Sequence, residues 1–138
     1  MKKRILFLCT HNSCRSQMAE ALANHFMGTR FQAFSAGTEA ARVNPLAIRV
    51  LSELGIDTTL LRSKTMDGFA GQTFDHVVTL CGDANEKCPL FFGGVERIHH
   101  GFEDPSRRKG SEEDVLPEFR RVRDEIKKWI IDCFGGAQ

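Results

Sequence analysis

The feature that most constrains this chain is an apolar run that ends at a cysteine and leads directly into a polar loop. Residues 3–9 read KRILFLC, which has the length and composition of a central strand in a parallel sheet. The polar stretch Thr10–Arg15 follows, and from Ser16 to Met27 small and apolar residues recur at helical spacing until Gly28 supplies a stop. The chain therefore opens with a strand, a polar loop and a helix.

The rest of the sequence continues this alternation. Further strands are predicted at residues 31–35, 75–81 and 95–98, and further helices at 45–54, 63–69 and 115–133. The helix at 45–54 has Asn44 as its N-cap, Pro45 in its first turn and Gly55 just past its end. Strands that alternate with helices indicate a parallel, helix-covered sheet, in which ligands bind beyond the carboxyl ends of the strands. Cys9 and Cys81, each at a strand end, should therefore meet at one edge.

Composition limits the classes of function. The 138 residues fit one domain spanning 1–138, and 19 basic against 18 acidic side chains leave no general attraction for nucleic acid or anionic membranes. No apolar run approaches the roughly 20 residues that span a bilayer, so we expect a cytoplasmic protein, and nothing requires more than a monomer. Five cysteines are an odd number, and the cytosol disfavours structural disulfides. Metal binding or thiol chemistry is therefore indicated.

The loop after the first predicted strand has the residue types that an oxyanion site needs. A strand-to-helix turn offers converging backbone N–H groups, and the positive end of the helix dipole reinforces them. In this setting Cys9 is expected to be nucleophilic near neutral pH, because the dipoles and the guanidinium of Arg15 favour its thiolate. Arg15 also presents a planar fork to two oxygens of phosphate or arsenate, and Ser16 can donate a hydrogen bond to Cys9.

Residues 9–20, CTHNSCRSQMAE, resemble the oxyanion loop of the low-molecular-weight tyrosine phosphatase superfamily. The superfamily pattern is a cysteine, five residues, then arginine and serine, and Cys9, Arg15 and Ser16 match it. The resemblance implies a three-layer α/β sandwich in one domain, with a four-stranded parallel sheet in the order 2-1-3-4. It also implies that the oxyanion is bound by Thr10, His11, Asn12, Ser13, Cys14, Arg15 and Ser16. His11 stands where glycine is frequent, so a positive φ there would be strained.

Residues 78–89, VTLCGDANEKCP, resemble the redox segment of thioredoxin-coupled arsenate reductases. Gln17 also favours the reductases, because phosphatases of this superfamily usually carry proline at that position. The resemblance implies that Cys9 attacks arsenate, that Cys81 then forms a disulfide with Cys9, and that Cys88 moves the disulfide to Cys81–Cys88 for reduction by thioredoxin. Two thiols supply the two electrons, so no tightly bound cofactor is expected. The reductant stays open between thioredoxin, glutaredoxin and a small thiol.

Two further assignments follow from the resemblance. Asp104, before Pro105, matches the general acid that protonates the departing oxygen, although an Asp-Pro pair is also a common turn starter. Asn12, Thr65 and Asp67 resemble positions that hold a potassium ion in some reductases.

Other interpretations of the same residues remain. The main alternative is a phosphotyrosine or phosphomonoester phosphatase that uses Cys9 and Asp104. A binding-only module with zinc on Cys9, Cys14, Cys81 and Cys88 is disfavoured by the spacing of the cysteines. Cys81 and Cys88 could also be inert buried thiols. Cys133 falls on the apolar stripe of the terminal helix and is expected to be a core thiol.

Overall fold

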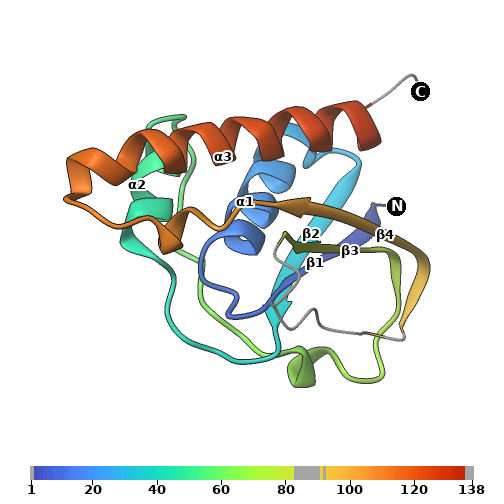
Figure 1. Ribbon diagram of the computed structural model, residues 1–138. Helices are drawn as coiled ribbons and strands as arrows, with labels where there is room; N and C mark the ends of the chain where they lie inside the picture. Colours follow the sequence, from blue (N-terminus) through green and yellow to red (C-terminus); the bar gives the residue numbers. More distant parts are fainter. Residues whose placement is uncertain (1, 83–90, 92, 136–138) are drawn as a thin grey trace.

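The computed structural model describes residues 2–82, 91 and 93–135, and its centre is a parallel sheet (Figure 1). The described strands are β1 (Lys3–Cys9), β2 (Phe31–Gly37), β3 (Phe74–Cys81) and β4 (Gly94–Phe102). Their order is β2-β1-β3-β4, and every neighbouring pair is parallel. The predicted parallel sheet in the order 2-1-3-4 is therefore confirmed.

Strand β4 is longer than the sequence predicted. It runs over nine residues, whereas only 95–98 had the apolar character of a strand. The strand lies at the edge of the described sheet, and six of its nine residues are exposed. An exposed edge strand does not need an apolar sequence. The charged and histidine side chains of β4 therefore give no hydrophobic pattern from which its full length could be predicted.

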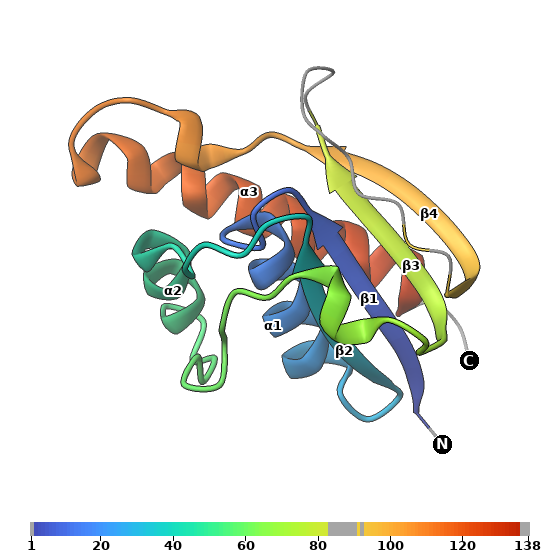
Figure 2. The same ribbon diagram turned by 90° about the horizontal axis from the view of Figure 1, so that it is seen from below.

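The two faces of the sheet are covered differently. Three α-helices, α1 (Arg15–Met27), α2 (Pro45–Ser52) and α3 (Glu112–Phe134), form one core with Ile5 and Phe7 of β1. Leu6 and Leu8 face the other way, where the 3-10 helix η1 (Met66–Phe69) and Phe91 cover them. Figure 1 shows α1 and α3 above the sheet and η1 below it, and Figure 2 shows the same layers from beneath. Burial on both faces explains why β1 is almost continuously apolar.

The predicted N-cap of α2 is confirmed, because the side chain of Asn44 accepts a hydrogen bond from Leu46 N at 2.8 Å. The helix ends earlier than predicted, at Ser52 with Glu53 as its C-cap, and Gly55, with a φ of 77°, lies in the turn that follows. Helix α3 begins three residues before the predicted Val115, because Ser111 forms a capping box with Asp114. The predicted helix at 63–69 is present only as η1.

The prediction that Cys133 is a core thiol is wrong. Cys133 is exposed, and the buried stripe of α3 passes instead through Ile126, Ile130 and Phe134. The predicted stripe advances in alternating steps of four and three residues, an average of about 3.5, whereas an α-helix has about 3.6 residues per turn, so the stripe drifts around a long helix. Over the 23 residues of α3 this drift turns Cys133 away from the core and leaves Trp129 only partly buried.

The end of β2 packs against the polar loop that follows β1. A Cβ atom added at Gly37 would lie 2.5 Å from Thr10 O and 2.9 Å from Asn12 N. Both neighbours are backbone atoms, which cannot move aside as the end of a flexible side chain can. Glycine at position 37 is therefore what allows the loop to lie this close to the sheet.

We expect Gly37→Ala to lower the free energy of unfolding by about 1–3 kcal/mol, because the added methyl group overpacks the loop backbone. Gly68→Ala is the matched control, since a Cβ at Gly68 meets nothing within 4 Å. Urea titration followed by circular dichroism measures both variants. Equal stability of the two variants would contradict the close packing at Gly37.

Candidate active site

A pocket of about 230 Å³ lies at the carboxyl end of the sheet. Its lining includes Cys9, Cys14, Arg15 and Asp104, with Ser106 beside the acid. Of the other residues predicted to bind an oxyanion, His11 and Ser13 also line the pocket, whereas Thr10, Asn12 and Ser16 do not. The structure thus brings the predicted nucleophile, guanidinium and acid to one cavity, as expected for strand ends in a parallel sheet.

Cys9 is buried at the base of the pocket and has a close polar neighbour. Its Sγ lies 2.8 Å from Ser16 Oγ, and Asn12 Nδ2 donates to the same hydroxyl at 2.8 Å. Because the Asn12 amide donates to the Ser16 oxygen, the hydroxyl hydrogen of Ser16 is free to point at the sulfur. The predicted contact between Ser16 and Cys9 is present, and Asn12 orients it.

Asn12, and not His11, takes the strained conformation in the loop. It has a φ of 49°, the only positive φ of a non-glycine residue in the described part of the chain. Asparagine tolerates this left-handed region better than most residues do. Gln17, which sequence reasoning used only to separate two branches of a superfamily, donates to Asn12 O at 3.0 Å and Asn12 Oδ1 at 2.9 Å. Gln17 therefore helps to hold the loop in its bent shape.

His11 lines the pocket and pairs with an acid that does not line it. Its Nε2 is 3.2 Å from Glu39 Oε2, and both side chains are largely exposed. The main-chain oxygen of His11 accepts a hydrogen bond from Ser63 Oγ at 2.9 Å. No local sequence pattern indicates these partners, which lie 28 and 52 residues farther along the chain.

The guanidinium of Arg15 is buried, and the ends of two strands hold it. Its Nη1 donates to the carbonyl oxygens of Leu80, in β3, and Phe102, at the end of β4, at 3.3 Å and 3.2 Å. Its Nη2 lies 3.6 Å from Asp104 Oδ2. A buried positive charge needs such partners, and here they fix the guanidinium at the pocket.

Asp104 enters the pocket from the segment between β4 and α3. Its Oδ1 accepts hydrogen bonds from Ser106 N at 2.9 Å and Ser106 Oγ at 2.6 Å, so Oδ2 is the oxygen nearer Arg15. The preceding residue, Glu103, pairs with Arg108 at 2.8 Å and with Arg121 of α3 at 2.8 Å. Arg108 also lies 3.1 Å from Glu118 of α3, so it helps to tie the segment that carries Asp104 to this helix.

Cys14 is a second buried thiol in the pocket. Burial, the negative charge of Asp104 and the proximity of Cys9 together raise the pKa of Cys14 well above its ordinary value, and Arg15 lowers it only in part. Cys14 therefore stays a neutral thiol in the folded protein.

The position of Cys81 is fixed where β3 and β4 come together. Cys81 is buried at the end of β3 and pairs in register with Phe102. A Cβ at Gly82 would lie 2.3 Å from Phe102 O, and one at Gly101 would lie 2.8 Å from Cys81 O. The two backbones can approach this closely only because both positions are glycine. Cys88 lies outside the described residues, so its predicted role stays a prediction.

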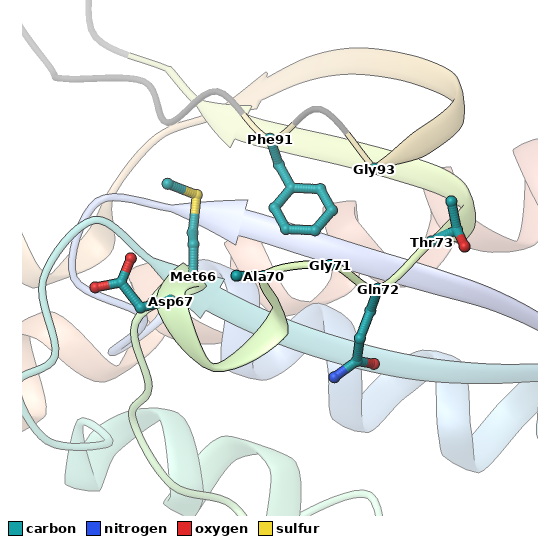
Figure 3. Close-up of a pocket in the computed structure, with 8 residues that line it drawn as sticks. All are labelled: Met66, Asp67, Ala70, Gly71, Gln72, Thr73, Phe91 and Gly93. Atoms are coloured by element: carbon teal, nitrogen blue, oxygen red, sulfur yellow. The ribbon is translucent and has the colours of Figure 1, made fainter.

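Asn12 does not fit as a potassium ligand. Its Oδ1 already accepts hydrogen bonds from Lys64 N at 2.8 Å and Gln17 Nε2 at 2.9 Å, which uses both lone pairs of the amide oxygen. Asp67 lines a separate pocket of about 490 Å³, beside Met66 and Phe91 (Figure 3). In that view the Asp67 carboxylate points away from the Phe91 ring. For Thr65 and Asp67 the prediction remains untested.

Among the described residues, no group of three or more histidine, cysteine, aspartate or glutamate side chains is placed to hold a metal ion. No helix in the described part is long and apolar enough to cross a membrane.

Residues 4–134 match the model of the low molecular weight phosphotyrosine protein phosphatase family, and the chain belongs to this family. Two curated relatives that are similar along most of the chain are arsenate reductases and not phosphatases. The chain is 49% identical to arsenate reductase from Halalkalibacterium halodurans over 129 residues, which cover 94% of this chain and 93% of that protein. It is also 49% identical to arsenate reductase from Bacillus subtilis over 124 residues, or 90% and 89% of the two chains.

Solved structures give the same grouping. An arsenate reductase in the phosphate binding state is 33% identical, with a TM-score of 0.78 over 96% of this chain and 95% of that one. The thioredoxin-dependent arsenate reductase of Corynebacterium glutamicum is 28% identical, with a TM-score of 0.60 over 94% of this chain and 62% of that one. The low molecular weight protein tyrosine phosphatase of T. tengcongensis is 25% identical, with a TM-score of 0.63 over 94% of this chain and 95% of that one.

The raised pKa of Cys14 predicts a loss of stability at alkaline pH. The unfolded chain releases the thiol proton at the ordinary pKa, whereas the folded protein keeps it to a higher pH. Stability is therefore unaffected below the ordinary pKa and falls as the pH rises from there through the raised value, with a slope of at most about 1.4 kcal/mol per pH unit.

Chemical denaturation between pH 7 and 10 measures this slope, and Cys14→Ala should make it shallower. Cys133→Ala is the comparison and should change the slope less, because Cys133 is exposed and partial burial raises the pKa of its thiol less than full burial raises that of Cys14. An unchanged slope in Cys14→Ala would contradict the assignment of a neutral buried thiol.

Proposed function

We propose that this protein reduces arsenate to arsenite, with Cys9 as nucleophile and Cys81 and Cys88 as the thiols that complete the reaction. The observation that carries the proposal is the meeting of three groups at one sheet edge. Cys9 and Arg15 line the oxyanion-sized pocket, and the guanidinium of Arg15 bonds to Leu80 O, directly before Cys81. The 49% identity to arsenate reductases along most of the chain supports the same reaction.

The first step joins sulfur to arsenic. The Cys9 thiolate attacks arsenate, an As–O bond breaks, and the departing oxygen leaves as water after Asp104 supplies a proton. Arg15 spans two of the remaining oxygens and stabilises their negative charge in a buried site. The bonds from Ser106 and the contact with Arg15 hold the Asp104 carboxyl in the pocket for this transfer.

The second step reduces arsenic. Cys81 attacks the sulfur of Cys9, the S–As bond breaks, and its electron pair stays on arsenic, which leaves as arsenite. The protein has then given two electrons and carries a Cys9–Cys81 disulfide. Cys88 next attacks Cys81, which releases the Cys9 thiolate and forms a Cys81–Cys88 disulfide.

An external thiol reductant must reduce the last disulfide to allow another turnover. We propose thioredoxin, in the cytoplasm, as this reductant, with the protein acting as a monomer. The support is the sequence segment around Cys81 and Cys88, together with the structural similarity to a thioredoxin-dependent reductase. Glutaredoxin and small thiols are the alternatives that a reductant comparison separates.

Phosphomonoester hydrolysis is the second candidate function. The same Cys9, Arg15 and Asp104 suffice for it, and the family model and one solved neighbour are those of phosphatases. The described lining of the pocket includes His11, Ala41, Asn44 and Ser106 and contains no phenylalanine, tyrosine or tryptophan that could form an apolar wall for a phenyl ring. Hydrolysis needs neither Cys81 nor Cys88, so variants at these positions separate the two reactions.

Cys9→Ser, Cys81→Ser and Cys88→Ser should each lower thioredoxin-dependent arsenite formation by at least about a hundredfold, because each removes one thiol that the cycle uses. Any hydrolysis of p-nitrophenyl phosphate should vanish only in Cys9→Ser. Cys133→Ser is the matched control and should keep full reductase activity. Multiple turnovers at the wild-type rate in Cys88→Ser would contradict the three-thiol sequence.

A further inference from the structure

Beneath the oxyanion loop lies a partly buried carboxylate that needs a counter-charge. Glu20 projects from α1, and its side chain is only 14% exposed. Its Oε1 accepts a hydrogen bond from Ser35 Oγ of β2 at 2.7 Å, and Ser35 is itself fully buried. One hydroxyl donor does not compensate a negative charge that has lost most of its water. A cation beside Glu20 is therefore required.

Lys64 supplies that cation. Its Nζ lies 3.6 Å from Glu20 Oε1 and donates to Arg62 O at 2.9 Å, and its side chain is 21% exposed. The ammonium group thus lies between a carboxylate oxygen and a main-chain carbonyl oxygen, which are ligands of the kind that a hard cation takes.

The backbone of the same residue is bonded to the loop. Lys64 N donates to Asn12 Oδ1 at 2.8 Å, and Lys64 O accepts from Gly37 N at 2.9 Å. Asn12 in turn donates to Ser16 Oγ, which lies 2.8 Å from the sulfur of Cys9. A continuous series of hydrogen bonds therefore joins Lys64 to the nucleophile.

We propose that the ammonium group of Lys64 is a built-in cation beside the oxyanion loop, so that the loop does not need the potassium ion that the family resemblance implies. Two observations on different groups support this. The amide oxygen of Asn12 has both lone pairs occupied, by Gln17 Nε2 and by the main-chain N–H of Lys64, so it cannot also bind an ion. The charge of Glu20 is already balanced from within the chain.

Two consequences follow for the nucleophile. Wild-type Cys9 should react equally well with and without potassium. Truncating Lys64 should leave Glu20 uncompensated, and the added negative charge should disfavour the Cys9 thiolate. It also leaves an opening lined by Glu20 Oε1 and Arg62 O, which potassium or ammonium ions, similar in size to the lysine head group, can enter.

The test compares the rate at which iodoacetamide alkylates Cys9 in potassium chloride and in choline chloride of equal ionic strength. Peptide mass mapping separates Cys9 from the other cysteines, and no arsenate is present, so the result stands whether or not the protein reduces arsenate. Wild-type rates should agree within about twofold, and Lys64→Ala should slow alkylation about fivefold in choline and recover in potassium. Thermal unfolding in both salts provides a second readout of the same cation preference.

Two control variants sharpen the result. Glu20→Gln combined with Lys64→Ala removes the charge that needs compensation, so alkylation of Cys9 should no longer depend on the salt. Lys128→Ala removes an exposed lysine that pairs with Asp132 on α3 and should behave as wild type. The proposal is overturned if potassium accelerates wild-type alkylation more than about twofold, if Lys64→Ala equals wild type in choline, or if its loss is not restored by potassium.

Discussion

The structure depends on one buried charge, the guanidinium of Arg15. Arg15 begins α1, but its partners are the carbonyl oxygens of Leu80 and Phe102, 65 and 87 residues farther along the chain. The site can therefore form only when β3 and β4 are paired and their ends are in register. The close backbone approach at Gly82 and Gly101 serves this requirement. Folding of the sheet and construction of the oxyanion pocket are thus the same event.

Further polar contacts hold the loop that ends at Arg15. Asn12, which has a left-handed backbone, donates to Ser16 Oγ through its side-chain amide, and its Oδ1 accepts hydrogen bonds from Lys64 N and Gln17 Nε2. Strained backbone of this kind persists only where surrounding contacts determine it fully. Residues that do not line the pocket therefore hold the loop in its anion-binding shape, and a site held in this way needs little reorganisation during the reaction.

Much of this was predictable from the sequence, and the reasons for the rest are physical. The strand-loop-helix unit with Cys9 and Arg15, the parallel sheet and the strand-end position of Cys81 follow from local patterns and the rule that ligands bind at strand ends. The length of β4, the exposure of Cys133 and the strained residue of the loop do not. The length of β4 and the exposure of Cys133 depend on which residues face the core in the folded protein. The positive φ of Asn12 depends on contacts from Lys64, 52 residues away in sequence.

The central claim is that two thiols of the protein supply the electrons that convert arsenate to arsenite. A single-turnover reaction of the fully reduced protein with arsenate, without thioredoxin or any other reductant, tests it most directly. The account predicts one arsenite per protein, the loss of two free thiols, and a disulfide that peptide mapping assigns to Cys81 and Cys88. A protein that keeps all its thiols reduced and releases no arsenite would contradict the account and leave hydrolysis as the function of the pocket.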